Sequence, residues 1–397
     1  MTENQGDPLP RIAIVGAGVC GLVLAQGLKK HGFQVTVYER EAHIGERAWE
    51  WTLILHWALP TLRNMLPGDV LADQPSAHAN PLYPYGDEPE TLPFYNSMTG
   101  DVALRMTAPF RRMSRRRLHE VCSKGLDIRW GTRVVDLKME KSGPVSLSLE
   151  NGRVAKADLV IGADGSSSRI RQWLVGEEAG RSTATDWTIG SGIIRYDADQ
   201  AKALLALSEI CSVSTGPSGM IVVAVSDFEN AQDASTCSFQ VVRIWKGEAV
   251  SCQGPEAIAR MKAATSRDSF SEPFYSAIHR MAQDSSPVFM RQLQYWPTVP
   301  WDNRTGRVTL VGDAAQCMLP NRGQGLNQAL DDVDCIVAQI SRMKEEGASI
   351  GEALGNYETD VFARGKKAAL ESLEDANAVM ATRDFGNSRQ ATQGLAK

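Results

Sequence analysis

The segment "RIAIVGAGVCGLVLAQGLKKHGFQVTVYER", residues 11–40, decides the fold of this chain. Ile12, Ile14 and Val15 predict a buried strand. Leucines at helical spacing follow them and predict a helix that Gly32 ends. "FQVTVYER" then predicts a second strand, so the segment is typical of an α/β protein with parallel strands.

The turn inside this segment carries three glycines, Gly16, Gly18 and Gly21, in the pattern G-x-G-x-x-G. In a Rossmann-like unit the first glycine allows the tight turn, the second lets the backbone approach a pyrophosphate, and the third lets helix and strand pack closely. Glu39 ends the second strand, where an acid binds a ribose hydroxyl, and indicates an adenosine without a 2′-phosphate. The sequence therefore predicts dinucleotide binding, and the alternative is a glycine-rich turn without a ligand.

Two later segments also predict a strand, a turn and a helix. In "KADLVIGADGSSSRIRQWL", residues 156–174, Asp164 follows the strand, and its simplest role is to cap the helix. In "LVGDAAQCMLPNRGQGLNQALDD", residues 310–332, Asp313 ends the strand and Gly325 begins the helix. A carboxylate can accept hydrogen bonds from a polyol, and a helix N-terminus can stabilise an anionic ring edge.

Together, in this order and spacing, the three segments resemble the class A flavoprotein monooxygenases, the para-hydroxybenzoate hydroxylase-like aromatic hydroxylases. The resemblance covers most of the chain. It implies that the first motif binds the ADP half of FAD, that the Asp164 motif serves FAD and NAD(P)H, and that Asp313 binds the ribityl chain. The cofactor-binding residues that it implies are Gly16, Gly18, Gly21, Glu39, Arg40, Arg47, Arg115, Asp164, Asp313, Gly325, Leu326 and Asn327.

The chain departs from this family at one position of the third motif. The family usually has Gly-Asp-Ala-Ala-His, whereas Gln316 stands in place of the histidine here. Glutamine forms hydrogen bonds but does not titrate, so we expect no acid–base role at this position.

The aromatic segment "RAWEWTLILHWALPTL", residues 47–62, supplies the pocket candidates Arg47, Trp49, Trp51 and His56. In the family this segment borders the isoalloxazine and the substrate cavity, while the simpler interpretation is core packing. The Trp-x-Trp pattern also suggests a flavin halogenase, but the Ile-Pro continuation of that signature is missing. The sequence identifies no catalytic residue.

The predicted fold is α/β: a discontinuous Rossmann-like FAD-binding domain with an inserted mixed β-sheet domain for substrate, and C-terminal helices. We expect the first part of the FAD domain at 1–175 and the substrate sheet at 176–300, where β-branched segments are bounded by Gly, Pro and Ser. The second part of the FAD domain and the helices are expected at 301–385, and a flexible tail at 386–397.

The resemblance implies that NADPH or NADH transiently reduces FAD and that O2 then forms a C4a-hydroperoxide. This species would hydroxylate or epoxidise an electron-rich, largely apolar small molecule. "RAWEWTLILHW" is similar to fungal secondary-metabolism monooxygenases, which implies an aromatic polyketide, indole alkaloid or prenylated metabolite. The alternatives are a reductase or dehydrogenase of the same fold, and a flavin- or nucleotide-binding module without turnover.

Composition excludes several other classes. A net charge of -5 over 397 residues argues against nucleic acid as a partner, although "FRRMSRRRLHE" is locally basic. Without a long apolar run we expect no membrane span, and without His/Cys spacing no metal site. Seven scattered cysteines and a polar start are typical of a cytoplasmic protein, which we expect to be a monomer or homodimer.

Overall fold

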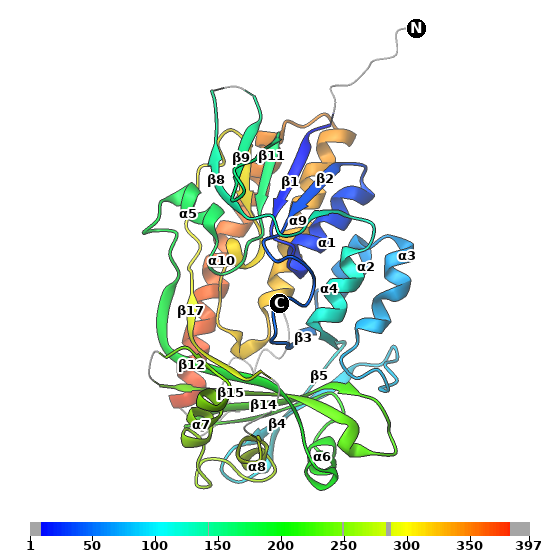
Figure 1. The fold of residues 1–397 in the computed structure, drawn as a ribbon, viewed down its shortest axis with the longest axis vertical. Coiled ribbons are helices and arrows are strands. Elements are labelled where there is room, and N and C mark those ends of the chain that lie inside the picture. The colour runs from blue at the N-terminus through cyan, green and yellow to red at the C-terminus, as the bar shows by residue number, and fades with distance from the viewer. Residues whose placement is uncertain (1–8, 142, 248–249, 283–286, 382–397) are drawn as a thin grey trace.

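The computed structural model describes residues 9–141, 143–247, 250–282 and 287–381. The predicted tail at 386–397 lies outside these residues. Two sheets lie at opposite ends of the molecule, and the long helix α10 (Ile350–Ala381) runs beside both of them (Figure 1). No helix among the described residues is both long and apolar enough to cross a bilayer.

The predicted strand–helix–strand unit forms the centre of the parallel sheet. The sheet has the order β18 (Val308–Leu310), β11 (Leu159–Gly162), β1 (Arg11–Val15), β2 (Gln34–Tyr38) and β7 (Asp127–Arg129). Ile14 on β1 lies opposite Val37 on β2 and Ile161 on β11, and all three side chains are fully buried. Continuous apolar strands of this kind are typical of a parallel sheet covered on both faces.

Helices and a small meander complete this end of the molecule. The helices are α1 (Val19–Lys30), α2 (Leu59–Met65), α3 (Gly68–Asp73), α4 (Arg115–Ser123), α5 (Arg169–Val175) and α9 (Gly325–Glu345). Helix α1 packs against α2, α4 and α9. The meander has the order β10 (Val154–Ala157), β9 (Val145–Leu149) and β8 (Val134–Lys138).

The larger sheet has eight strands and is mixed, because β13 and β4 pair in parallel. Its order is β16 (Cys252–Gln253), β17 (Phe289–Tyr295), β12 (Thr183–Arg195), β15 (Cys237–Lys246), β14 (Gly219–Phe228), β13 (Cys211–Gly216), β4 (Glu90–Asn96) and β5 (Val102–Ala108). Strands β4 and β5 come from the part of the chain before residue 176, so the sheet is not built from residues 176–300 alone.

Three helices cover the outer face of the larger sheet: α6 (Ala198–Leu205), α7 (Pro255–Ala263) and α8 (Phe274–His279) (Figure 1). The ribbon of β3 (Thr52–Leu55) and β6 (Arg111–Ser114) lies between the two sheets. Helix α10 connects both ends, since Tyr357 donates to Leu310 O on β18 at 2.7 Å and Asn377 accepts from Trp187 on β12 at 3.2 Å.

Candidate functional site

The glycine turn between β1 and α1 has the close packing that its sequence predicts. Gly16 has φ +110°, and a Cβ there would lie 2.4 Å from the carbonyl oxygen of Ala163. A Cβ on Gly21 would lie 2.1 Å from the carbonyl oxygen of Gly16, whereas one on Gly18 would meet nothing within 4 Å. The turn is therefore packed on its inner side and open at Gly18, where a ligand could approach the backbone.

Glu39 lies beside this turn at the carboxyl end of β2. Its Oε2 accepts a hydrogen bond from the amide of Ala17 at 2.7 Å, and its Oε1 accepts one from the amide of Glu41 at 3.0 Å. Arg47 pairs with Glu41 at 2.5 Å, while Arg40 is exposed. The acid is thus fixed by backbone amides at the open side of the turn.

Arg115 is the first residue of α4 and lies over the Trp51 ring, 4.6 Å from the ring centroid. Burial is the main cause that lowers the pKa of Arg115, and the charge of Arg47 lowers it further. The charges of Glu50, Glu41 and Glu39 raise the pKa of Arg115, so carboxylates partly balance the two arginines. Their guanidinium groups offer donors of the kind that bind a pyrophosphate.

Asp164 has the capping role that the sequence left open. Its carboxylate accepts hydrogen bonds from the amides of Arg169, at 2.7 Å, and Ile170, at 3.3 Å, at the start of α5. Arg171 on the same helix is fully buried and donates to the carbonyl oxygen of Asp313 at 3.2 Å and to that of Ser166 at 2.6 Å. Arg171 therefore ties the second motif to the third, a role that the sequence analysis missed.

Asp313 follows β18 in a short turn. Burial raises the pKa of its carboxyl group, and the positive charges of Arg291 and Arg171 oppose this rise. The Asp313 side chain is nevertheless exposed to solvent. Within the described residues, no hydrogen bond reaches its carboxylate. An acceptor enclosed by protein but still accessible is suited to the hydroxyls of a bound ligand.

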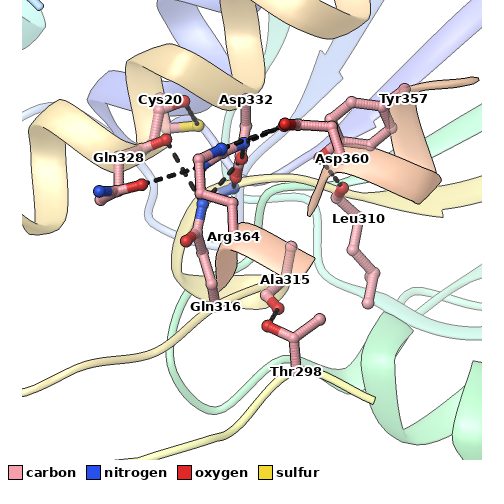
Figure 2. Close-up of polar contacts among 12 residues, drawn as sticks. Cys20, Thr298, Leu310, Ala315, Gln316, Gln328, Asp332, Tyr357, Asp360 and Arg364 are labelled. Carbon is pink, nitrogen blue, oxygen red and sulfur yellow. Dashed lines mark hydrogen bonds and ion pairs between the residues drawn. The ribbon is translucent and has the colours of Figure 1, made fainter. Parts of the chain in front are cut away.

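The turn before Asp313 is held by a buried ionic network (Figure 2). Asp332 on α9 is fully buried, and its Oδ2 accepts a hydrogen bond from the Gly312 amide at 2.7 Å. Its Oδ1 accepts from Gln316 at 2.7 Å and from Arg364 on α10 at 2.6 Å. Gln316, at the position of the departure from the family, thus acts as a neutral donor that holds Asp332.

Helix α9 starts at Gly325 without a side-chain cap, and a Cβ on Gly325 would meet nothing within 4 Å. Its first amides are therefore open to a ligand. Leu326 packs against the core. The buried Asn327 side chain donates to Ile54 O at 3.0 Å and accepts from the His56 amide at 3.0 Å, so it fixes β3 and leaves only its backbone for a ligand.

The predicted pocket residues do not all lie together. Trp49 contacts Phe289 of the larger sheet, with 5.6 Å between ring centroids. Trp51 instead lies under Arg115, and His56 is buried against Trp57, 5.7 Å between ring centroids. Among these aromatic residues, the structure places Trp49 beside the larger sheet and Trp51 beside Arg115.

These features fit the two halves of FAD. The open glycine turn and its two cations suit a pyrophosphate, the accessible Asp313 carboxylate suits ribityl hydroxyls, and the uncapped start of α9 suits an anionic ring edge. No cluster of His, Cys, Asp or Glu in the described part of the chain could hold a metal ion.

Comparisons with known proteins agree with this fit. The chain matches a model of the FAD binding domain family over residues 107–372 and one of an NAD(P)-binding Rossmann-like domain over residues 14–63. FAD-dependent monooxygenase phnB from Penicillium herquei is 30% identical over 390 residues, covering 93% of this chain and 90% of that protein.

Solved structures show the same fold at low sequence identity. The 2,6-dihydroxypyridine-3-hydroxylase from Arthrobacter nicotinovorans superposes with a TM-score of 0.74 at 18% identity, covering 96% of each chain. A salicylate hydroxylase substrate complex superposes with a TM-score of 0.72 at 19% identity, covering 98% of this chain and 93% of that one. With the family match and the phnB relative, the chain belongs to the class A FAD-dependent monooxygenases.

Proposed function

We propose that this monooxygenase uses NADPH or NADH together with O2 to hydroxylate or epoxidise an aromatic or other electron-rich, largely apolar small molecule. One observation carries the proposal. Ile54 and Leu319, from β3 and the loop before α9, share a buried cluster with Phe94 and Val242 on the inner face of the larger sheet. The cofactor motifs and an apolar sheet face therefore border the same region, where a ligand on the sheet would lie next to the flavin.

In this proposal FAD supplies, when bound, the redox chemistry that links the nicotinamide to O2. The protein binds and orients it, and the residues that we assign to this task are Gly16, Gly18, Gly21, Glu39, Arg40, Arg47, Arg115, Asp164, Asp313, Gly325, Leu326 and Asn327. The open amides at the start of α9 would stabilise negative charge on the ring edge of the reduced flavin.

On the substrate side, the proposal assigns the wall of the pocket to Trp49, Phe289 and the apolar inner face of the sheet. Such a wall excludes water and accepts a flat ring. Aromatic polyketides, indole alkaloids and prenylated metabolites are the substrates to screen first. Trp51 and His56 would support this wall from the cofactor side.

The test is rapid mixing of the anaerobic holoenzyme with NADPH and then NADH, with and without candidate aromatics, followed by isotopically labelled O2. We expect loss of the visible flavin absorbance with the nicotinamide and one labelled oxygen atom in the product. Reduction of flavin without label in any product would contradict the proposal and favour the reductase or dehydrogenase alternative.

A further inference from the structure

The loop between β18 and α9 is fastened from behind by the end of α10. Its short turn, Pro320–Arg322, lies just before the open start of α9. The amide of Leu319 donates to the Ser372 hydroxyl at 3.0 Å, and the guanidinium of Arg322 pairs with Asp375 at 3.2 Å. Two contacts to one turn of α10 therefore hold the segment that leads into α9.

The ion pair in this contact is buried. The side chains of Arg322 and Asp375 are 8% and 5% exposed, whereas those of the pair Arg342 and Glu346 are 36% and 55% exposed. Glu371 lies 3.9 Å from the same guanidinium, so a second carboxylate of α10 faces Arg322. Separating a buried pair leaves a charge without compensation, so this pair restrains the loop more strongly than a surface pair would.

The opposite side of the loop is also enclosed. Gly323 has φ +64°, and a Cβ there would lie 2.7 Å from the Cγ2 atom of Ile54 on β3. The Asn327 side chain in the first turn of α9 donates to the Ile54 carbonyl oxygen at 3.0 Å. The loop is therefore held between β3 and α10, and its position depends on both contacts.

The same part of α10 also contacts the larger sheet. Ala376 is buried in the apolar cluster of the inner face, and Leu373 packs against that cluster. Asn377 accepts a hydrogen bond from Trp187 on β12 at 3.2 Å. The end of α10 is thus fixed by the sheet, and it can serve as a rigid support for the loop.

We propose that Ser372 and Asp375 are positioning residues, which hold this loop so that the open amides of α9 meet the ring edge of the flavin. The inference rests on the proposed function, because it takes the start of α9 to face the flavin. A helix N-terminus stabilises negative charge within about one turn, so a small displacement of the loop would weaken its effect on the reduced flavin. The two residues act through Leu319 and Arg322.

The test measures the reduction potential of FAD in the loaded enzyme, by anaerobic dithionite titration with a reference dye of known potential. Ser372→Ala changes no charge, while Asp375→Leu and Asp375→Asn remove the same charge. The matched control is Arg243→Met on β15. Arg243 is also buried, and it donates to the carbonyl oxygens of Ser218 and Ala264 at 2.7 Å on the outer side of the larger sheet.

We expect Ser372→Ala and Asp375→Leu to lower the ratio of reduced to oxidised FAD about three- to tenfold at a fixed potential, which is about 15–30 mV for a two-electron couple. Asp375→Asn should shift the ratio less, because its amide oxygen can still accept from Arg322. Loss of negative charge alone would instead raise the potential equally in both Asp375 variants. Arg243→Met should lower the thermal midpoint and leave the potential unchanged.

Unchanged potentials in Ser372→Ala and Asp375→Leu, or an equal rise in both Asp375 variants, would overturn the inference. A shift of the same size in Arg243→Met would also overturn it, because general destabilisation would then explain the effect. If Asp375→Leu does not fold, Ser372→Ala still decides, since it loses one hydrogen bond and no charge. Failure of the proposed function is recognised separately, because product labelling with O2 can fail while the potential still depends on Ser372 and Asp375.

Discussion

Replacing Arg364 with methionine tests whether the network behind Asp313 holds the site together. The substitution leaves the Asp332 carboxylate fully buried, with the Gly312 amide and Gln316 as the remaining donors of the network (Figure 2). The volume of the side chain is roughly kept, so the main change is the loss of the cation. Asp332 would then be a buried charge without a counter-charge.

The expected loss follows from the burial of this pair. Breaking a buried ion pair by removing one partner costs about 3–5 kcal/mol. An unfolding entropy of about 2.1 cal/mol/K per residue gives roughly 0.8 kcal/mol/K for a chain of 397 residues. The thermal midpoint of the FAD-free protein should therefore fall by about 4–6 °C, and FAD affinity should fall with it because Gly312 positions Asp313.

Scanning calorimetry at one scan rate measures this loss, with Arg342→Met as the matched control. Arg342 on α9 also bonds a carboxylate, Glu346 at 2.9 Å, but both side chains are exposed, so its loss should cost less than about 1 kcal/mol. The double variant Asp332→Asn/Arg364→Met should regain much of the lost stability, because no charge is left buried. The reasoning would be refuted if Arg364→Met and Arg342→Met had equal thermal midpoints. It would also be refuted if the stability losses of the single variants Asp332→Asn and Arg364→Met simply added in the double variant.

The pH dependence gives a second check on the same variant. Burial raises the pKa of Asp332, and the charge of Arg364 opposes this rise. Removing Arg364 should therefore raise the pKa of Asp332 further. The folded state then binds a proton at Asp332 at a higher pH than the unfolded chain does. Protonation of Asp332 therefore stabilises the folded state as pH falls. The stability difference between Arg364→Met and the wild type should therefore narrow toward acidic pH.

Three further variants test the rest of the site. Gly21→Ala should give little soluble, folded protein, because its Cβ would lie 2.1 Å from the Gly16 carbonyl oxygen, whereas Gly355→Ala on α10 meets nothing within 4 Å and should express normally. Asp313→Ala should raise the Kd for FAD about tenfold or more, and a variant that stays fully yellow on dialysis would contradict the ribityl assignment. Burial lowers the pKa of His119 from 6.5 to about 4, so the folded state excludes a proton that the unfolded chain binds. The wild type should thus lose up to about 3 kcal/mol as pH falls between these values, and His119→Gln should lose less in urea titrations at each pH.

Local chemistry explains which parts of the fold the sequence predicted. The positive φ at Gly16, the approach of Gly21 to the Gly16 carbonyl oxygen, the buried strand before them and the uncapped start of α9 depend on neighbouring residues, so they can be recognised from a short segment. The parallel pairing of β13 with β4 joins segments more than 100 residues apart, and no local pattern indicates it.

The same distinction applies to the side chains of the site. Asp164 and Asn327 were predicted from their positions in motifs, but hydrogen bonds to α5 and to β3 occupy their side chains. Arg171 was missed because its role depends on the distant turn at Asp313. An arginine in a helix or strand has no spacing signal that reveals which remote turn it will meet.

The glutamine at position 316 shows why a departure from a motif can leave the site intact. Arg364 already balances the charge of the Asp332 carboxylate. A second cation, at position 316, would therefore have no further negative charge of Asp332 to balance it. What the position must supply is a donor for Oδ1, and the amide of Gln316 supplies it at 2.7 Å without titrating. The hold on the Gly312 turn then depends on the pair Asp332–Arg364, in which burial raises the pKa of Asp332 and the charge of Arg364 opposes this rise. Because Gln316 stands where the family has a histidine, this position adds no titrating group to the network.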